Sequence, residues 1–286
     1  MSAETPLTTR QDRERARQRR SRRSIVISTV STVVVLGALV ALLVTSPGWH
    51  NVRTTFFSWS VFRHSFGDVL DGFWLDVRMF LVIEVVVLVL GLVIALIRTS
   101  QAPALFPLRL LATVWVDVLR GVPTILVVYL IGFGVPALAI KGLPTSAVVL
   151  GGAALAMSYS AYVAEVFRAG IESIHPSQTA AALALGLTRR QAMRQVVLPQ
   201  AVRRVVPPLL NDFISLQKDV ALVSILGPQE AFRVAQVFAA SQFNYTPLIA
   251  AALLYLCVTI PLTRIVDRLQ ARTVRERGAA LALGPR

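Results

Sequence analysis

Long apolar runs alternate with short polar segments along most of the chain. A helix needs about 20 apolar residues to cross the hydrocarbon core of a membrane. Six runs approach or exceed that length, at residues 24–45, 73–97, 122–139, 145–166, 207–226 and 247–265. The first run is too long for the apolar region of a signal peptide, and no small-residue cleavage site follows it. The pattern therefore predicts an all-α integral membrane protein with six transmembrane helices, the first of them retained.

Composition and charge support this interpretation. The chain is 55% hydrophobic and 15% charged, whereas a soluble domain carries about a quarter charged residues. The net charge of +14 could indicate a nucleic-acid partner, but the arginines cluster beside apolar runs, at residues 10–23, 168–204 and 264–286. Because cytoplasmic loops are enriched in Lys and Arg, these clusters mark cytoplasmic ends. We expect a multi-pass protein of the cell (inner or plasma) membrane, with both termini cytoplasmic, membrane lipid around it and no nucleic acid bound.

The sequence lacks the usual signatures of catalysis and of cofactor binding. It contains no G-x-x-x-x-G-K-[ST] loop, so ATP cannot be bound in the P-loop manner. His50, His64 and His175 are scattered, and the single cysteine, Cys257, lies in an apolar run. Neither a metal site nor a disulfide is expected from this arrangement. We predict that the chain is not an enzyme and binds no cofactor or metal itself.

Several segments lie outside the spans. Residues 1–23 are polar, carry eight arginines and are expected to form a disordered cytoplasmic tail, with a second cytoplasmic tail at residues 270–286. The segment at 49–76 is rich in aromatic residues, which favour the headgroup level, so part of it should lie along the outer membrane interface. An inner-interface helix at residues 110–119 is expected to bend at Gly121 and Pro123 into the third span.

The polar segment at residues 165–205 is interrupted at regular points by helix-ending residues. Ser177 is placed to cap a short Ala-rich helix over residues 178–185, and Gly186 is placed to end it with a positive φ. Thr188 and Gln191 have the spacing of a capping box for a second helix over residues 189–197, which Pro199 is expected to close. Two short helices joined at an angle form a compact knuckle, which indicates a docking surface.

Polar residues inside the spans follow a pattern of their own. On the fifth span Asp212, Ser215 and Asp219 share one face, and Asn211, Ser215 and Lys218 form an overlapping stripe. A polar stripe in lipid faces the bundle interior or a water-filled cavity. It is either an ion-pair network that fixes helix packing or the lining of a pathway. Lys218 points roughly 100° away from Asp219, so this carboxylate needs another cation, water or a bound ammonium group.

Two further sets of charged residues are expected to be structural. Glu84 lies about a third of the way along the second span and should face the bundle or a partner helix. Glu165 and Arg168 are one turn apart at the inner end of the fourth span and are expected to pair at the hinge of the polar loop.

The polar loop resembles the EAA loop of ABC-importer permeases: an Ala-rich turn, a glycine and a spacer leading to Leu-Pro. The positions that carry this resemblance are Ala180, Ala181, Ala182, Gly186, Leu198 and Pro199. The flanking sequences EVFRAGI, LPQA and PPLLNDFISLQKDVALVSILG, and DVLRGVPTILVVYLIGFGVP at residues 117–136, are similar to the polar amino-acid uptake family. The resemblance extends over residues 67–269, and the motifs together are highly specific.

The resemblance implies a permease subunit of an ATP-driven importer for polar amino acids. It implies a five-helix type I core within residues 67–269, containing the coupling loop at 165–205 and preceded by an extra helix at 24–45. A homodimer or heterodimer of permeases would act with ABC ATP-binding subunits, which use ATP and Mg, and with an extracytoplasmic amino-acid-binding protein. The residues implied to contact the ATPase are Ser177, Ala180, Ala181, Ala182, Gly186, Leu187, Thr188, Leu198 and Pro199. Those implied to line the substrate pathway are Asn211, Ser215, Lys218 and Asp219.

The sequence departs from the family pattern in two places, and two other classes of protein compete with the permease. Ala180 stands where the family usually has Glu, which would complete a capping box with Ser177. Val220 and Ala221 replace the small hydroxyl residues that often follow Lys-Asp. A secondary transporter should show repeated halves and broken mid-membrane helices, which are not evident. A non-transporting scaffold would not need a punctuated loop beside a polar-striped helix.

Overall fold

The computed structural model describes residues 7–100 and 102–282, with side chains from residue 24 to residue 271 apart from 101. The described residues contain helices, turns and bends, and no strand. The chain divides into two compact units, Met1–Phe56 and Phe57–Arg286. The expected all-α class is confirmed.

The first unit consists of helices α1 (Leu7–Val44) and α2 (Trp49–Phe56). The apolar part of α1, Ser24–Val44, is long enough to cross a membrane and buries none of its side chains within the structure. Residues 7–23 were expected to be disordered but continue α1 as helix. Their sequence is rich in Arg, a good helix former, and contains neither Gly nor Pro, so it favours a helix. Residues 1–6 lie outside the described part of the chain.

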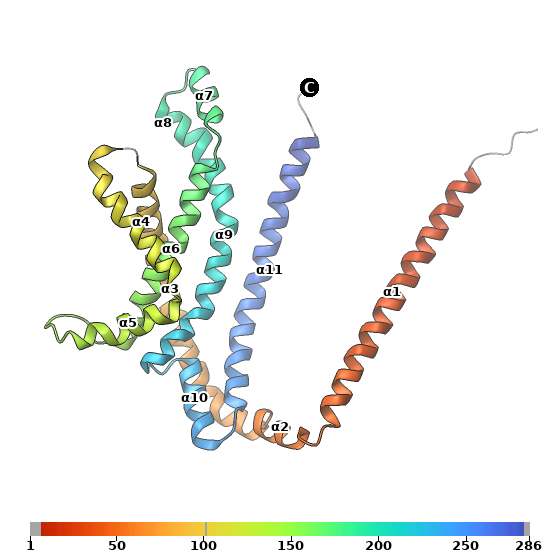
Figure 1. The fold of residues 1–286 in the computed structure, drawn as a ribbon. Helices are drawn as coiled ribbons and strands as arrows, with labels where there is room; N and C mark the ends of the chain where they lie inside the picture. The colour runs from red at the N-terminus through yellow and green to blue at the C-terminus, as the bar shows by residue number, and fades with distance from the viewer. Residues whose placement is uncertain (1–6, 101, 283–286) are drawn as a thin grey trace, which may run out of the picture. The chain divides into compact units, whose positions relative to one another are not determined.

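The second unit contains the remaining helices (Figure 1). Its helices are α3 (Trp59–Thr99), α4 (Phe106–Gly121), α5 (Thr124–Ala137), α6 (Ala147–Glu172), α7 (Pro176–Ala184), α8 (Arg189–Ala192), α9 (Leu198–Asp219), α10 (Ala231–Gln242) and α11 (Thr246–Ala282). Shorter turns are the 3-10 segments Pro103–Leu105 and Val220–Leu226 and the π-helical segment Met193–Val197. Two predicted boundaries were wrong: α3 begins at Trp59 and includes much of the expected outer segment, and α11 extends to Ala282, through most of the expected tail.

Within the described residues, four helices are long and apolar enough to cross a membrane, or five if the bent pair α4–α5 counts as one span. The polar helix α9 is not among them, and it contains five charged residues, at positions 203, 204, 212, 218 and 219. The expected six-helix arrangement is consistent with this count when α9 is included.

The bend between α4 and α5 is the sharpest break in the second unit. The two helix axes differ in direction by 109°. Val122 is extended, and Pro123 precedes the first residue of α5. The predicted bend at Gly121 and Pro123 is therefore confirmed, and its cause is the clash of the Pro ring with a continuing helix.

Helix α6 forms the centre of the second unit. It packs against α3, α4, α5 and α9, and its residues Leu155, Ala161 and Ala164 are fully buried. A Cβ added to Gly151 would lie 2.3 Å from the Val223 side chain, so only glycine allows this approach. Small residues on α6 therefore allow close helix packing.

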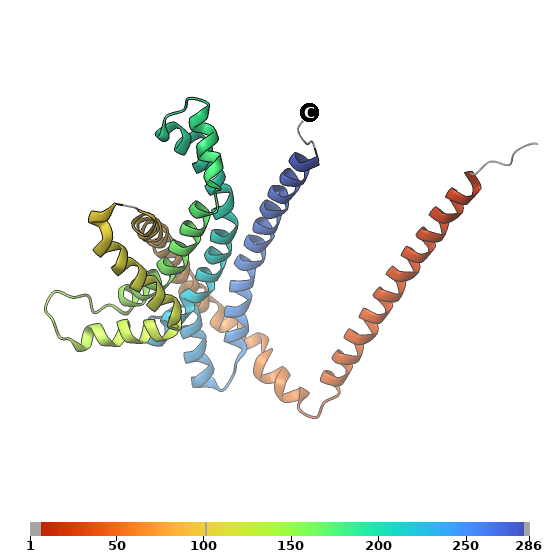
Figure 2. The same ribbon diagram turned by 45° about the horizontal axis from the view of Figure 1, so that its top comes forward.

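The second unit has two distinct ends. Helices α7 and α8 lie at one end, which we call the loop end, and α10 lies at the opposite end (Figures 1 and 2). Helices α6 and α9 run side by side between them and connect the two ends.

Candidate functional site

The loop end is organised by the knuckle, which we define as residues His175–Ala192. Helix α7 begins earlier than predicted, because Pro176 occupies its first position and His175 is the N-cap. The His175 ring nitrogen Nδ1 accepts a hydrogen bond from the Ser177 N–H at 3.2 Å. The expectation that Ser177 caps this helix was therefore wrong: the fixed φ of proline suits the first helical position and moves the cap upstream.

This shift also changes the meaning of the Ala180 position. With His175 as N-cap, the third helical residue is Gln178, so a glutamate at position 180 would lie too far along the helix to complete a capping box. The Gln178 side chain instead accepts a hydrogen bond from Gln200 on α9 at 3.3 Å. Ala180 and Ala181 are exposed, whereas Ala182 is buried. The explanation of the family glutamate as a capping residue does not hold for this chain.

Helix α7 ends at the predicted glycine. Gly186 has φ +85°, and its N–H donates to the Leu183 carbonyl at 2.9 Å. The Leu187 N–H donates to the Ala182 carbonyl at 3.2 Å, which completes a Schellman motif. A Cβ on Gly186 would meet no atom within 4 Å, so the requirement for glycine comes from the backbone conformation alone.

The start of α8 is also as predicted. The Thr188 hydroxyl accepts from the Gln191 N–H at 3.3 Å, and the Gln191 side chain accepts from the Thr188 N–H at 2.9 Å. This reciprocal pair is the expected capping box.

The predicted end of the second helix was wrong. Residues Met193–Val197 form a π-helical turn, and the chain continues through Leu198 and Pro199 into α9 without a stop. Pro199 is the second residue of α9, which directly follows the π-helical turn. The helix that contains the start of the predicted fifth span does not begin at Pro207: α9 is one helix from Leu198 to Asp219, and Pro207 and Pro208 lie inside it.

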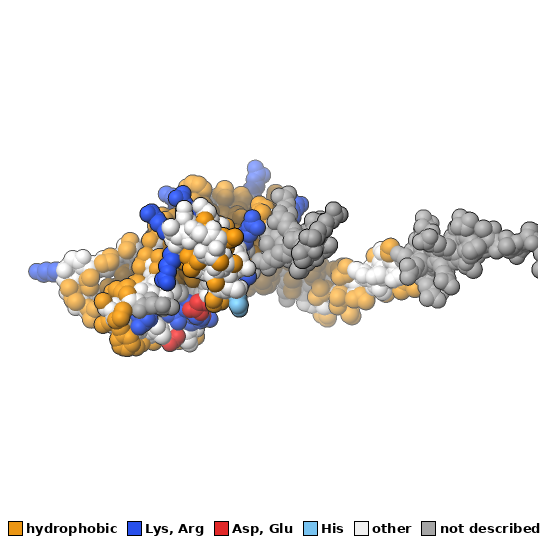
Figure 3. Space-filling model, turned by 90° about the horizontal axis from the view of Figure 1, so that it is seen from above, with side chains coloured by type: hydrophobic (Ala, Val, Ile, Leu, Met, Phe, Trp, Pro, Cys, Tyr) orange, Lys and Arg blue, Asp and Glu red, His pale blue; other side chains and the backbone are white. Residues whose placement is uncertain are grey.

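The knuckle is attached firmly to both neighbouring helices. Ile174, Val197 and Ala201 form a small buried cluster beneath it. A Cβ on Gly170 of α6 would lie 2.0 Å from Val205 of α9, so the two helix backbones approach closely there. Among the apolar side chains of the knuckle, that of Leu185 is the most exposed, at 84%. Figure 3 looks onto this end, where basic side chains spread around apolar and polar surface.

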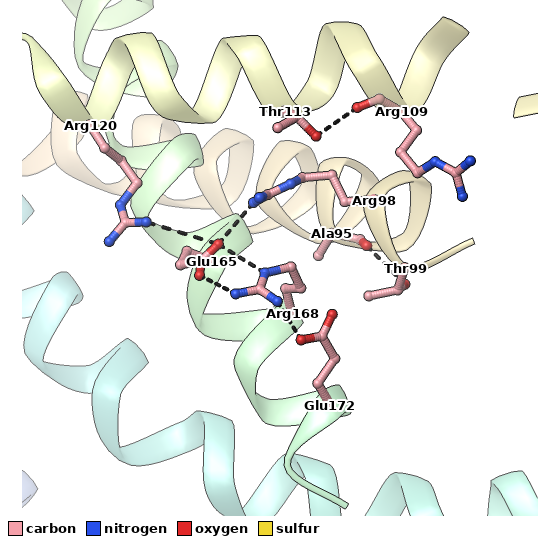
Figure 4. A network of polar contacts seen from close by, with 9 residues as sticks. All are labelled: Ala95, Arg98, Thr99, Arg109, Thr113, Arg120, Glu165, Arg168 and Glu172. Atoms are coloured by element: carbon pink, nitrogen blue, oxygen red, sulfur yellow. Dashed lines mark hydrogen bonds and ion pairs between the residues drawn. The ribbon is translucent and has the colours of Figure 1, made fainter. Parts of the chain in front are cut away.

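A network of charged groups joins three helices near the loop end (Figure 4). Glu165 of α6 accepts a hydrogen bond from Arg98 of α3 at 2.8 Å and from Arg168 at 3.0 Å. Arg120, at the end of α4, lies 3.9 Å from the same carboxylate, and Arg168 also pairs with Glu172. The Glu165–Arg168 pair thus belongs to a larger network. The sequence did not indicate that Arg98 and Arg120 would join it.

The polar residues of α9 separate into two environments. Asp219 accepts a hydrogen bond from the Tyr159 hydroxyl of α6 at 2.8 Å. Lys218 is exposed and lines a pocket of about 670 Å³ whose walls also include Arg233 of α10 and Tyr255 of α11. The carboxylate predicted to need a cation or water therefore has a tyrosine hydroxyl as its partner, which the sequence did not indicate.

A second pocket lies nearer the loop end. It measures about 380 Å³ and is lined by Arg120, Tyr162, Glu165, Arg204 and Asp212, among others. One carboxylate oxygen of Asp212 is buried and has no hydrogen-bond partner among the described residues. On α9, Asn211 is exposed and Ser215 is half-buried. Two pockets therefore border α9, one along Arg204, Pro208 and Asp212 and the other at Lys218.

The opposite end contains a buried group that we call the carboxyl cluster, formed by Asp76, Glu230 and Tyr255. Asp76 of α3 accepts from the Tyr255 hydroxyl at 2.8 Å and from the Ala231 N–H at 3.4 Å. Glu230 is fully buried and caps α10 by accepting from the N–H groups of Phe232 and Arg233, at 2.8 and 2.5 Å. Burial, together with the neighbouring Asp76 carboxyl, raises the pKa of Glu230 to about 8.

The described residues contain no group of three or more His, Cys, Asp or Glu side chains arranged to hold a metal ion. The candidate functional features are a docking surface at the loop end and two pockets along α9 whose linings include charged side chains.

Comparison with known proteins connects this geometry to a family. Residues 88–275 match the family described as the binding-protein-dependent transport system inner membrane component. The chain is 32% identical to the probable glutamine ABC transporter permease protein GlnM of Bacillus subtilis (strain 168), over 74% of this chain and 96% of that protein. It is 33% identical to the arginine transport system permease protein ArtQ of the same organism, over 69% and 88%. A crystal structure of an amino acid ABC transporter with histidines superposes with a TM-score of 0.65 at 32% identity, covering 72% of this chain and 94% of that chain.

Proposed function

The chain belongs to the family of binding-protein-dependent transport system inner membrane components, and we propose that it is the permease subunit of an ABC importer for polar amino acids. The family is a transporter family, and the permease chain itself is not catalytic. ATP hydrolysis falls to a separate ATP-binding subunit that uses Mg. Relatives named for glutamine and arginine support a substrate among the polar amino acids.

The proposal that this chain couples to an ATP-binding subunit rests on the structure of the knuckle. It projects two short capped helices and an exposed Leu185 from the loop end. A rigid helix with exposed apolar side chains is suited to a groove on a partner. The surface assigned to the ATP-binding subunit is that of Ser177, Ala180, Ala181, Gly186, Leu187, Thr188, Leu198 and Pro199, whereas Ala182 is buried and supports that surface from within.

Movement of the knuckle would reach the membrane through α6 and α9. Both helices are anchored to it, and the close approach at Gly170 and Val205 prevents them from sliding freely. Closure of the ATP-binding subunits would therefore displace α6 and α9 together as a lever. Because the Glu165 network ties α3, α4 and α6 together, these three helices would move as one body.

The substrate path is assigned to the polar side of α9, at Asn211, Ser215, Lys218 and Asp219. Asp219 presents a carboxylate held by Tyr159, and Lys218 presents an ammonium group in the larger pocket. A polar amino acid carries both charges, so a path with separated acidic and basic groups matches its chemistry. Topology follows from the arginine clusters, with both termini and the loop end cytoplasmic.

The last part of the proposal is the assembly of the complete transporter. Two permease chains, identical or different, act with two ATP-binding subunits, and an extracytoplasmic binding protein delivers the amino acid. Co-purification of the permease with the ATP-binding subunit, followed by ATPase assays with binding protein and each amino acid, tests the proposal. Stimulation by polar amino acids is expected. An ATPase rate that no amino acid stimulates would contradict the function, and failure to co-purify would contradict the assembly.

Asp219→Asn tests the path separately. The substitution keeps size and hydrogen bonding but removes the charge, so we expect normal assembly, uptake lowered at least tenfold and a basal ATPase rate that the substrate stimulates weakly. Tyr159→Phe, which removes only the hydroxyl that orients Asp219, should lower uptake less. Asp71→Asn, at an exposed position of α3, is the matched control and should transport normally. An Asp219→Asn protein that fails to assemble would instead favour a structural network.

A further inference from the structure

A groove of about 490 Å³ runs along the surface of the second unit between α3 and α6. Leu75, Val82 and Val86 of α3 form one wall. The floor and the other wall come from α6, where Gly152, Ala153 and Ala156 leave room that larger side chains would fill. The lining is apolar except for one guanidinium group, that of Arg78.

The groove can hold most of one acyl chain within one leaflet. From Arg78 to Val86 it extends over eight residues of α3, which is about 12 Å at 1.5 Å per residue. The hydrocarbon core is about 30 Å thick, so a single leaflet contributes about half of it. The rims are well exposed, at 67% for Val82 and 52% for Val149, so an apolar molecule can enter from the lipid side.

Arg78 lies within one turn of the end of this groove that Leu75 lines, and most of its hydrogen-bonding capacity is unused. Its Nε donates to the Trp74 carbonyl at 3.4 Å, and its guanidinium lies 5.8 Å from the centre of the Trp74 ring. None of the ion pairs among the described residues includes Arg78. A charged group at a lipid-facing position is costly without a partner, and a guanidinium matches the geometry of a phosphate group well.

Along the groove, the charged side chain and the apolar side chains follow the same order as the headgroup and the acyl chain of a phospholipid. On α3, Arg78 lies toward the end opposite the loop end, and Val82 and Val86 follow toward the membrane centre. Trp74, which is 57% exposed one turn before Arg78, is of the residue type that favours the headgroup level. A headgroup at Arg78 would therefore direct its acyl chain along the groove toward the midplane.

We propose that this groove binds a membrane phospholipid, with one acyl chain between α3 and α6 and the phosphate group at Arg78. A protein helix is the competing occupant, but it would have to supply an acidic residue to Arg78. The apolar segment at residues 24–44 contains no Asp or Glu and could not supply one. The match in charge therefore favours the lipid.

Native mass spectrometry of the delipidated full-length permease, titrated with dioleoyl phosphatidylglycerol, tests the proposal. The wild-type chain is expected to retain one phospholipid that Arg78→Gln binds at least fivefold more weakly. Gly152→Leu should abolish this binding, because its side chain fills the floor. Arg63→Gln, at another arginine of the same helix, and Gly134→Leu, which faces open space on α5, are matched controls and should bind as wild type does.

Two further measurements test the headgroup and the occupant separately. Dioleoylglycerol, which lacks phosphate, should bind the wild-type chain no better than phosphatidylglycerol binds Arg78→Gln. A photoreactive p-benzoylphenylalanine in place of Val149 should cross-link to phospholipid in native membranes, which tests occupancy without relying on the fold of Gly152→Leu. Unchanged lipid binding in Arg78→Gln and Gly152→Leu, or cross-linking to a polypeptide, would overturn the proposal.

Discussion

The two ends of the second unit are built by different kinds of interaction. At the loop end, the turns and helix caps of the knuckle are formed by hydrogen bonds between residues at most five positions apart, such as those of Gly186 and Thr188, and one longer-range bond joins Gln178 to Gln200. At the opposite end, the carboxyl cluster joins residues 155 and 179 positions apart, at Asp76–Ala231 and Asp76–Tyr255. The knuckle is largely exposed and the cluster is buried.

This difference determines what each end can do. An exposed structure whose turns and caps are formed locally, on a base fixed by α6 and α9, can present its shape to a partner. A buried polar cluster depends on every helix that contributes to it, so it fixes how α3, α10 and α11 sit together. We therefore expect changes in the knuckle to affect coupling and changes in the cluster to affect stability.

Gly186→Val should have the largest effect. It tests whether the shape of the knuckle at the loop end is needed for coupling. A β-branched residue at φ +85° costs on the order of 1–2 kcal/mol or more, so the Schellman turn should open. We expect loss of the ATP-binding subunit on co-purification and uptake lowered at least tenfold, with normal membrane insertion. Gly142→Val is the matched control, since Gly142 also has a positive φ, of 93°, but lies in the α5–α6 turn. Normal coupling in Gly186→Val would remove the knuckle as the docking surface.

Substitution of Glu230 tests the opposite end and should change stability. Because Glu230 is buried beside Asp76, the folded protein holds a proton on this pair to a higher pH than the unfolded chain, which releases the Glu230 proton near the ordinary pKa of 4.5. The folded state then binds more protons above that value, so the free energy of unfolding should fall as pH rises from about 5 to about 8. Apparent melting temperatures of the detergent-purified permease across this range measure the slope.

Two variants separate the charge of Glu230 from its capping role. Glu230→Gln should flatten the pH dependence, whereas Glu230→Ala should lower stability by roughly 1–3 kcal/mol, because the N–H groups of Phe232 and Arg233 lose their acceptor. Glu172→Gln, at an exposed position of α6, should keep the wild-type slope. A slope that persists in Glu230→Gln would assign the titration to another group.

Thr188→Ala should have the smallest effect. It tests how much a single helix cap contributes to the knuckle. Loss of a threonine N-cap costs about 1 kcal/mol, which should loosen α8 without unfolding the knuckle. Faster amide hydrogen exchange over residues 188–192 and a few-fold weaker binding of the ATP-binding subunit are expected. Ser241→Ala removes an exposed hydroxyl from α10 that caps no helix start, and should change neither measurement. Unchanged exchange in Thr188→Ala would show that the capping box does not hold α8.

Features that depend on neighbouring residues were predicted well from the sequence. The Gly186 turn, the Thr188–Gln191 capping box and the bend at Gly121 and Pro123 were all found where expected. The errors at Ser177 and Pro199 arose because proline is tolerated in the first turn of a helix, so it can lie at a beginning as well as at an end. Sequence pattern alone does not distinguish these two uses.

The sequence by itself determined the membrane class, the apolar runs and the knuckle, because hydrophobicity and turn geometry act over short distances along the chain. Only the tertiary structure decided which polar groups meet. The Tyr159 hydroxyl as partner of Asp219, the arginines of three helices around Glu165 and the burial of Asp76 beside Glu230 all depend on how helices pack. A polar side chain in an apolar run must find a partner, but its identity depends on the rotation and depth of a neighbouring helix, which no local pattern specifies.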